Sequence, residues 1–337
     1  MHDMILGQPA FVAEALRRTA AADGSSFLGR PRRLVLTGCG TSFHAAMYGA
    51  RVFQEVMPSV PVLAIHAYDL AFGSPVPANA MVLGVSHSGS TPTTNRALRR
   101  ARRRGCRTLA VCGLPDSAIE RVAHHTLVIG STHDHSWANT MSYTTQLAAF
   151  AALASQSRSH VGPSIEPSLR GLTRSLQTTL GCESRVRRLA TRVAHKARVT
   201  FLGSDLDEIT ALEAALKIRE TCSLSASGYH TEQFLHGPFL SIDERESIVM
   251  LRSRDDGPRS AAIARALGAS GATVMTIGES ARAKIRLPAL PRILRPILSI
   301  VPLQFLAYYA ALARRANPDI MRTDTARLRA GVEALFH

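Results

Sequence analysis

One pattern occurs in both halves of the chain: a short apolar strand leads into a glycine-containing loop that opens onto a helix. In the first half, residues 34–37 lead into GCGTS (38–42) and an apolar helix over 45–56. In the second half, residues 199–202 lead into Gly203, a polar loop and another helix. This order begins a doubly wound unit with a parallel sheet. The sequence therefore predicts an α/β fold with two pseudo-symmetric layers and a cleft between them.

The remaining elements alternate in the same way. Strands are predicted at 62–65, 81–85, 108–112 and 126–129, and again at 247–251, 273–277 and 284–287. Helices are predicted at 5–18, 94–104, 139–154, 169–180, 187–194 and 261–267, with a linker at 24–31 and a Ser/Pro/Gly-rich junction at 156–167. We therefore expect an N-terminal helical segment (1–30), a first domain (31–158), a second domain (168–316) and a tail (317–337) that closes over the site.

Length and composition fit two domains of ordinary size, each with its own core. The chain has 337 residues, of which 46% are hydrophobic. Its net charge of +15 comes from 40 basic residues that include only three lysines, which indicates a general arginine bias. The densest arginine run (99–104) falls at the end of a predicted helix, where cations complement the helix dipole. A solvated helix end is favoured over a phosphate-backbone site, so no nucleic-acid partner is expected.

The five cysteines are odd in number and form no CxxC pair, which favours a reduced, intracellular protein. The N-terminus lacks a basic region followed by a long apolar run, so no signal peptide is expected. The apolar segment 297–312 contains Pro302 and Gln304 and is shorter than the ~20 residues of a membrane span. A buried helix, a cytoplasmic location and no membrane association are therefore predicted.

The strand at 81–85 ends in SHSGST (86–91), followed by Pro92 and a helix. Thr91 is placed to be the N-cap and Pro92 the first helical residue. Free N–H groups and the helix dipole at such a position attract phosphate, while Ser86 and Ser88 offer hydroxyl donors. Clusters of Ser, Gly and Thr are more often simple turns. A second such loop, GCGTS, strengthens the anion-binding interpretation, because ligands of parallel sheets bind beyond the carboxyl ends of the strands.

The helix after Gly203 carries Glu213, Lys217 and Glu220, separated by four and then three positions. All three therefore lie on one helix face. His236 follows shortly, and Gly237 and Pro238 end the helix that carries it. By spacing alone, an ordinary salt-bridged helix face is the favoured explanation.

The loop that holds His133, Asp134 and His135 carries side chains of the kinds that ligate metals. No third ligand accompanies these residues at a diagnostic spacing, so we expect polar loop residues and no metal. No cofactor motif is evident either.

Several motifs in a fixed order carry a resemblance that composition cannot supply: GCGTS, SHSGST, ANTMSYTTQLAA (138–149), FLGS with ALEAALKIRE, EQFLHGPF, and VPLQFLAYYAAL (301–312). Together they resemble tandem sugar isomerase (SIS) domain proteins, above all the isomerase half of glutamine:fructose-6-phosphate amidotransferase, over nearly the whole chain. The resemblance implies two SIS domains of flavodoxin-like topology, a homodimer and a phosphosugar ligand.

The resemblance also implies roles for individual residues. Glu220 would move a proton between the first two sugar carbons, His236 would assist ring opening, and Lys217 with Glu213 would complete the polar cluster. The chemistry fits, since enolisation needs a carboxylate that takes and returns a proton beside a cation that stabilises oxyanion charge. The residues implied to hold the phosphate and sugar are Thr41, Ser42, Ser86, His87, Ser88, Thr91 and Asn139.

Departures from that relative narrow the expected chemistry. The chain begins with His2 after Met1, where a glutaminase domain with a cysteine nucleophile would be expected, and Ala326 stands near the position of a tail lysine. In these respects the chain resembles the stand-alone SIS deaminases. We therefore expect an aminosugar phosphate such as glucosamine 6-phosphate to be converted to a ketose phosphate and ammonia. A fructosamine-6-phosphate deglycase, the reverse amination and a non-catalytic phosphosugar sensor remain alternatives.

Overall fold

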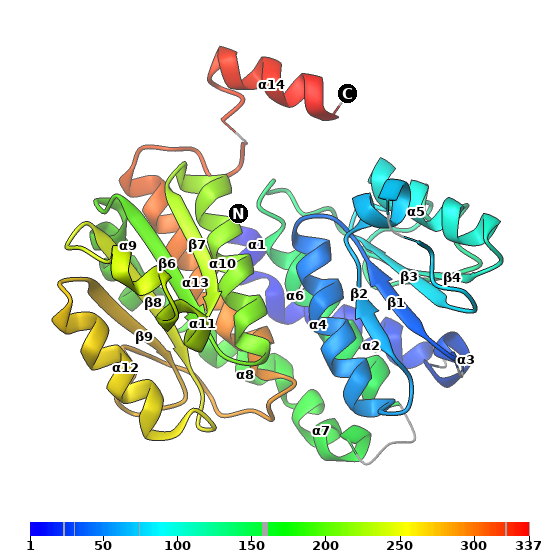
Figure 1. Cartoon of the computed structure of the whole chain (residues 1–337), viewed down its shortest axis with the longest axis horizontal. Coiled ribbons are helices and arrows are strands. Elements are labelled where there is room, and N and C mark those ends of the chain that lie inside the picture. The colour runs from blue at the N-terminus through cyan, green and yellow to red at the C-terminus, as the bar shows by residue number, and fades with distance from the viewer. Residues whose placement is uncertain (23, 30, 74, 157–160, 321, 337) are drawn as a thin grey trace.

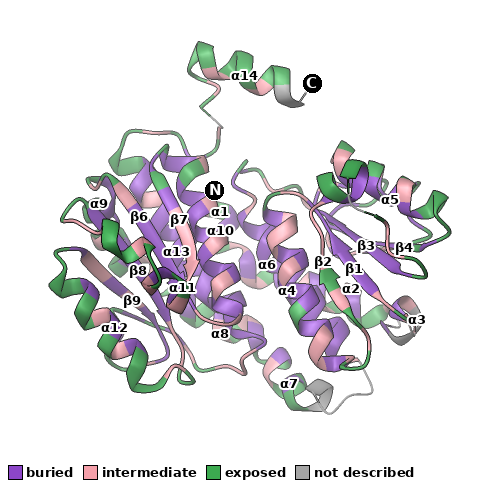
Figure 2. Cartoon of the chain, in the orientation of Figure 1, coloured by how far each residue is buried: buried purple, intermediate pink, exposed green. Residues whose placement is uncertain are grey.

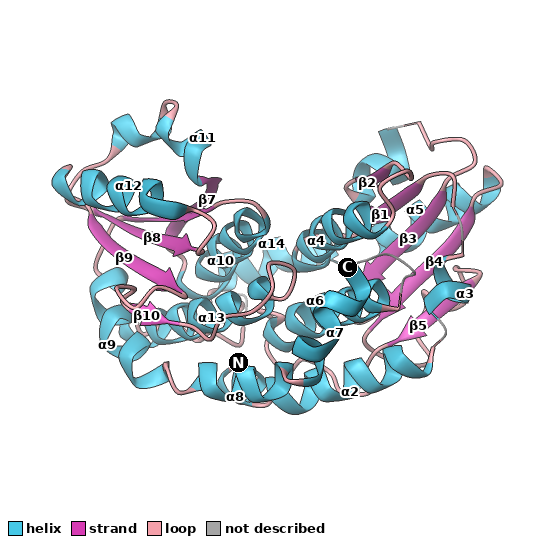
Figure 3. Ribbon diagram, turned by 90° about the horizontal axis from the view of Figure 1, so that it is seen from below, coloured by secondary structure: helices cyan, strands magenta, loops and turns pink. Residues whose placement is uncertain are grey.

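A computed structural model describes residues 1–337 except 23, 30, 74, 157–160, 321 and 337. Two five-stranded parallel sheets lie on either side of a layer of helices (Figure 1; Figure 3). The predicted α/β class with two flavodoxin-like sheets is confirmed. The expected domain boundaries at residues 30 and 158 fall outside the described residues, so the division of the chain at those points stays a prediction.

The first sheet has the strand order β2-β1-β3-β4-β5. Its strands are β1 (Leu34–Thr37), β2 (Val62–Ala64), β3 (Met81–Ser86), β4 (Arg107–Cys112) and β5 (His125–Val128). β3 is buried along its whole length because helices cover both faces of the sheet. In β1, Val35 packs into the cluster on the outer face of the sheet, while Leu34 and Leu36 pack into the central core.

The second sheet repeats this topology, with the order β10-β9-β8-β6-β7. Its strands are β6 (Arg198–Gly203), β7 (Ser225–His230), β8 (Glu246–Arg252), β9 (Thr273–Gly278) and β10 (Ile285–Arg286). In both sheets the strand that comes first in sequence lies second from one edge, with the third strand beside it. The direction in which successive strands are added to the sheet reverses between those two strands, which is where doubly wound folds bind ligands.

The layer between the sheets contains α4 (Thr41–Val56) and α6 (Thr140–Ser155) from the first half and α10 (Leu206–Cys222) and α13 (Arg295–Ala313) from the second (Figure 3). Contacts join α10 to α4 and α13 to α6. One hydrophobic cluster runs through this layer and includes Phe53, Phe150, Phe201 and Phe305. Each half also has a cluster of its own on the outer face of its sheet. Between the sheets, the apolar faces of four helices are buried against one another across the two halves, so this part of the core is shared.

Helix α13 is the helix in the described part of the chain that is long and apolar enough to cross a membrane. It is a core helix here, since 78% of its most apolar window is buried and it packs against α9 (Glu183–Ala194) and α10. The predicted buried helix over 297–312 is confirmed. Pro302 lies inside α13 and is itself buried.

Strand β7 was missed by the sequence analysis. Its sequence, SASGYH, lacks the apolar alternation of a half-buried strand. Gly228 explains its position, because a Cβ there would lie 2.6 Å from backbone atoms of Ala211 on α10. The absence of a side chain lets α10 lie directly on the strand. The β-strand forms through pairing with β6 and through this close packing.

Helices precede and connect the sheets. The N-terminal segment forms α1 (His2–Leu6) and α2 (Gln8–Ala21), divided at Gly7, and the expected linker contains α3 (Gly24–Leu28). The expected junction contains α7 (Val161–Arg170), followed by α8 (Leu172–Leu180). Outer-face and peripheral elements are η1 (Asp69–Gly73), α5 (Pro92–Arg103), α11 (Thr231–Leu235), η2 (Pro238–Ser241) and α12 (Gly257–Ala269).

The C-terminal helix α14 (Ala326–Phe336) stands away from both sheets (Figure 1). Its described side chains are mostly exposed, in contrast to the buried central helices (Figure 2). Closure of the tail over a bound ligand stays a prediction.

Candidate active site

Two glycines allow the strands and helices of the site to approach closely. Gly38 follows β1 and Gly203 ends β6. A Cβ on Gly38 would lie 2.8 Å from the Ser42 carbonyl oxygen, and one on Gly203 would lie 2.1 Å from that of Asp207. The first turns of α4 and α10 are therefore packed tightly against the carboxyl ends of the strands that precede them. The same device thus positions both helices that carry the polar cluster.

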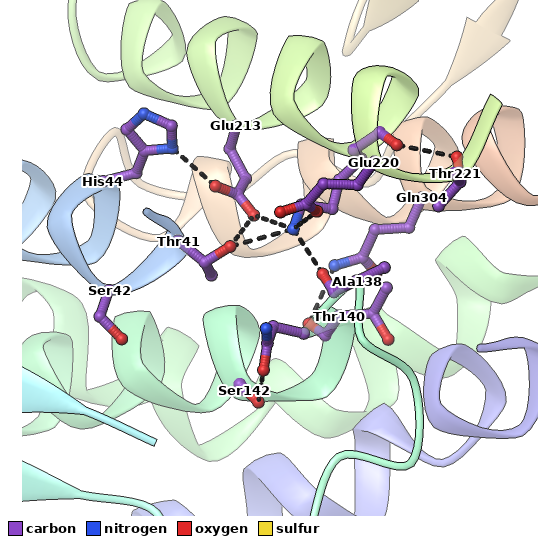
Figure 4. A network of polar contacts seen from close by, with 12 residues as sticks. Thr41, Ser42, His44, Ala138, Thr140, Ser142, Glu213, Glu220, Thr221 and Gln304 are labelled. Carbon is purple, nitrogen blue, oxygen red and sulfur yellow. Dashed lines mark hydrogen bonds and ion pairs between the residues drawn. The ribbon is translucent and has the colours of Figure 1, made fainter. Parts of the chain in front are cut away.

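The column predicted on α10 is present (Figure 4). Glu213 and Lys217 are fully buried, whereas the side chain of Glu220 is 20% exposed. Lys217 Nζ lies 2.5 Å from Glu220 Oε2 and 3.3 Å from Glu213 Oε1. The ammonium also donates to the Thr41 hydroxyl at 3.0 Å and to the Ala138 carbonyl at 2.5 Å. Four acceptors from three segments of the chain therefore surround one buried cation.

The pKa values of the two carboxylates of this column are shifted in opposite directions. Burial opposes ionisation of Glu213, but the Lys217 ammonium and hydrogen bonds from His44 and Thr41 outweigh it and hold its pKa below the usual range. Burial raises the pKa of Glu220, and Lys217 only partly offsets that effect. Burial alone would lower the pKa of Lys217, yet the two carboxylates together raise it. Glu213 and Lys217 form a fixed ion pair, while Glu220 is the carboxylate better able to gain and lose a proton.

Glu213 joins the two halves of the molecule through α4. Its Oε2 lies 2.6 Å from His44 Nδ1, and its Oε1 accepts a hydrogen bond from the Thr41 hydroxyl at 3.0 Å (Figure 4). His44 was missed by the sequence analysis. The sequence does indicate that His44 lies near Thr41, because it follows Thr41 by three positions and so lies on the same face of α4.

The SHSGST loop lies at the end of β3, directly before α5. Ser86 and Thr91 hydroxyl oxygens are 3.2 Å apart, and those of Ser88 and Ser90 are 2.8 Å apart. Thr91 occupies the N-cap position as predicted, but its side chain makes no capping hydrogen bond. Ser86 instead accepts from the Gly89 amide at 3.1 Å. Several hydroxyls thus gather at a helix N-terminus that no side chain caps, which is a suitable environment for an anion.

His87 points away from this group of hydroxyls. Its ring is buried against Gly113, where a Cβ would lie 2.0 Å from His87 Nδ1. It lines a small pocket with Phe11, Ile129 and Thr145. Burial lowers the pKa of this histidine, with Asp134 opposing the effect. The ring therefore does not join the hydroxyl donors of the loop, and its implied contact with phosphate stays a prediction.

Ser42 and Asn139 flank the column. The Ser42 hydroxyl accepts a hydrogen bond from the Gln146 amide of α6 at 3.2 Å. Asn139 adopts the left-handed conformation (φ 51°) at the start of α6, and its side chain donates to the Trp137 carbonyl at 2.8 Å. This turn brings the neighbouring Ala138 carbonyl to Lys217. The backbone of the 138–139 turn therefore contributes a hydrogen-bond acceptor to the site. A sequence pattern does not reveal such a backbone contact.

His236 is not part of the cluster in this structure. It lies at the end of α11 with its side chain 71% exposed, and its nearest described charged partner is Glu232, at 4.0 Å. Phe239 and Leu240, which follow it, are also exposed. The structure thus brings Thr41, Glu213, Lys217 and Glu220 together, and it leaves His236 at the surface.

An open groove of about 500 Å³ lies between the start of α4, strand β7 and the face of α10 that carries Leu212, Leu216 and Arg219. It is lined by Phe43, His44, His66, Arg219 and Tyr229, together with neighbouring backbone and apolar residues. The side chain of His44 is 17% exposed. His44 therefore contacts the buried carboxylate on one side and this groove on the other.

The loop 133–135, considered above as a metal site, has a structural role at Asp134. The Asp134 carboxylate accepts hydrogen bonds from the amide and hydroxyl of Ser142, both at 3.1 Å, and so caps the first turn of α6. Within the described part of the chain, no group of three or more His, Cys, Asp and Glu side chains could hold a metal ion.

Comparison with known proteins agrees with this geometry. Residues 27–156 match the model of the SIS domain. The glutamine–fructose-6-phosphate aminotransferase (isomerizing) of Symbiobacterium thermophilum is 32% identical over 305 residues, which cover 86% of this chain and 50% of that protein. The chain therefore spans about half the length of the curated relatives it matches.

Two solved structures share the whole fold. The C-terminal domain of glucosamine-fructose-6-phosphate aminotransferase from Francisella tularensis matches with a TM-score of 0.85 and 21% identity, covering 94% of this chain and 96% of that one. Glucosamine-6-phosphate deaminase from Thermotoga maritima matches with a TM-score of 0.73 and 19% identity, covering 92% and 96%. Residues 27–156 therefore match a SIS domain, and the chain as a whole is similar to the isomerase half of the aminotransferase in sequence and in its two-sheet fold.

Proposed function

We propose that the protein is an aldose–ketose isomerase that also deaminates an aminosugar phosphate such as glucosamine 6-phosphate, giving a ketose phosphate and ammonia. The observation that carries this proposal is the Lys217–Glu220 pair at 2.5 Å, next to Thr41 and Ser42 at the same sheet edge as the SHSGST loop. Such an arrangement combines a proton-transferring carboxylate, a fixed cation and an anion-binding loop.

Glu220 is the proposed proton shuttle. Burial raises its pKa, which favours a carboxyl group that exchanges its proton during turnover. Lys217 is held in place by four acceptors and would stabilise the oxyanion that develops as the proton leaves carbon. Glu213, fixed as a carboxylate, keeps Lys217 and His44 in position.

The phosphate would be held at the start of α4 and α5. β1 and β3 are neighbours in the sheet, so the loops that follow them lie side by side. The Thr94 hydroxyl, in the first turn of α5, contacts Cys39 Sγ in the GCGTS loop at 3.8 Å. Ser42, Ser86, Ser88 and Thr91 therefore belong to one region, where the phosphate of an open-chain sugar would place its first two carbons toward α10.

The relatives named above support a phosphosugar substrate. The aminotransferases act as isomerising enzymes by their names, and the Thermotoga protein is a glucosamine-6-phosphate deaminase. The chain matches about half the length of each aminotransferase, so we do not assign glutamine to it as the amine source. Ala326 stands near the position of the tail lysine that the resemblance to the amidotransferase would lead one to expect, which favours release of the amine over its transfer.

A cytoplasmic homodimer is part of the same proposal. The five cysteines are free thiols, which fits a reducing compartment. His236 and the exposed Phe239 and Leu240 form a surface that would suit contact with a second copy. Light scattering on the purified chain would test this, with a mass of one 36.3 kDa chain contradicting the dimer.

A fructosamine-6-phosphate deglycase is the second candidate, and the groove beside His44 favours it. A departing amino acid needs room and a cation for its carboxylate, and the groove offers about 500 Å³ lined by the exposed Arg219. The non-catalytic sensor is less well supported, because a sensor has no need of the buried Glu213–Lys217–Glu220 column.

One panel experiment separates these functions. The protein is incubated with glucosamine 6-phosphate, other aminosugar phosphates and fructosamine 6-phosphates carrying different amino acids, while ammonia, free amino acid and sugar phosphates are quantified. Ammonia and a ketose phosphate support the deaminase, and a free amino acid supports the deglycase. Binding of these compounds without any turnover would contradict both and leave the sensor.

A further inference from the structure

The proposed reaction needs a proton donor that the groups assigned so far do not supply. After a proton has moved between the first two sugar carbons, the amine nitrogen is part of an imine. Water adds to the imine carbon, and the C–N bond breaks when the nitrogen is protonated. At the same time the new hydroxyl loses a proton as it becomes a carbonyl. The step therefore consumes one water and needs a group that gives a proton to nitrogen and regains one from oxygen.

Lys217 is not suited to this task. An ammonium has three N–H donors, and four acceptors already surround Lys217 Nζ within 3.3 Å. Burial between two carboxylates raises its pKa, so it retains its proton. Glu213 is also occupied, since Thr41, His44 and Lys217 all contact its two oxygens. Glu220 serves the carbon-to-carbon proton transfer.

His44 is placed differently. Its Nδ1 lies 2.6 Å from Glu213 Oε2, which fixes the ring as a carboxylate fixes the imidazole of a catalytic triad. Among the residues that the structure describes, no second hydrogen-bond partner of this ring is found, and the ring borders the open groove of about 500 Å³. A histidine oriented by a buried carboxylate, with its other nitrogen free, is the usual form of a protein acid–base group.

The groups that face His44 fit this role. From α10 these are Glu213 and Glu220, with Lys217 behind Glu213 and Arg219 across the groove. From the segment after β2, His66 lines the same groove, with its ring packed edge-on against Phe43. The ring of His44 therefore lies between a buried carboxylate and the open groove, so a proton on it could pass between them.

Resting on the proposed function, we propose that His44, oriented by Glu213, is the acid–base residue that protonates the departing amine nitrogen and takes back the proton of the new hydroxyl. Glu213 is then a positioning residue for His44 as well as the partner of Lys217. No sequence motif indicated this role for His44. His236, which the resemblance implied as a catalytic residue, lies at the surface.

The test separates proton exchange at carbon from release of the amine. His44→Asn keeps a donor toward Glu213 but cannot transfer a proton, and the exposed His195→Asn at the end of α9 is the control outside the groove. In D2O, deuterium uptake into the sugar by NMR reports the Glu220 step, and ammonia or amino acid release reports the hydrolytic step. We expect His44→Asn to slow release by about 10²-fold or more while deuterium uptake stays within a few-fold of wild type.

A pH profile gives the readout that a merely structural role would not change. The pH dependence of the release step in the wild-type protein should contain a limb that is missing from the residual rate of His44→Asn. In His44→Ala, added imidazole should restore part of the release. Wild-type release by His44→Asn, or equal loss of uptake and release without imidazole rescue, would overturn the inference. A wild-type protein that showed neither uptake nor release would refute the proposed function and this inference with it.

Discussion

Removing the ammonium of Lys217 is a demanding test of the buried network. In Lys217→Met the methionine fills a similar volume, but Glu213 and Glu220 lose their shared cation. Breaking a buried ion pair on one side typically costs about 3–5 kcal/mol, because the remaining charge is left without a partner. For a chain of 337 residues with an unfolding entropy of about 2 cal/mol/K per residue, this corresponds to a fall in Tm of about 4–7 °C.

The size of this deficit should depend on pH. Without the ammonium, burial raises the folded-state pKa of both carboxyl groups above the unfolded value of about 4.3. A group with a raised folded pKa contributes its stability below the unfolded pKa and loses it as the pH rises through the folded pKa. The deficit of Lys217→Met relative to wild type should therefore be smallest near pH 4 and grow toward pH 8.

Urea unfolding followed by circular dichroism at several pH values measures this effect. The exposed Lys284→Met is the control and should stay within about 0.5 kcal/mol of wild type. Adding Glu213→Gln to Lys217→Met should recover stability at neutral pH, because it removes the unpaired buried carboxylate. A Lys217→Met protein as stable as wild type at every pH would refute the description of this cluster.

Two further predictions concern the phosphate loop and the packing of β7. Replacing Ser88 and Thr91 together by Ala should weaken binding of a sugar phosphate by calorimetry and leave the unphosphorylated sugar unchanged; equal weakening of both would argue against phosphate at this loop. Gly228→Ala should destabilise the protein by about 1–3 kcal/mol, because the new Cβ would meet α10 backbone at 2.6 Å. The control Gly331→Ala on α14 meets nothing within 4 Å and should be neutral, so equal effects of the two changes would contradict the packing.

The fold could be predicted where strands are apolar runs bounded by glycine loops. β1, β3, β4 and β8 are of this kind, and their burial on both faces is what makes such runs recognisable. β7 could not be predicted, since SASGYH is a strand only because α10 and β6 pack against it. The shared core was also out of reach, because it depends on how the helices of both halves meet.

The site divides in the same way. The column on α10 follows from local spacing, so Glu213, Lys217 and Glu220 were correctly placed on one face. Their partners come from distant segments: Thr41 and His44 lie about 170 residues earlier, and the Ala138 contact is made by a backbone carbonyl. Helical spacing contains no information about such contacts. The implied role of His236 rests on the resemblance alone, and the structure places this residue at the surface.

The central claim is that Glu220 moves a proton between adjacent carbons of a bound phosphosugar. Deuterium uptake from D2O into the sugar, measured by NMR for wild type and Glu220→Gln at matched ligand occupancy, tests it most directly. We expect uptake by the wild type and a loss of at least about 10²-fold in Glu220→Gln, with phosphosugar affinity by calorimetry nearly unchanged. Uptake by Glu220→Gln at the wild-type rate would contradict it.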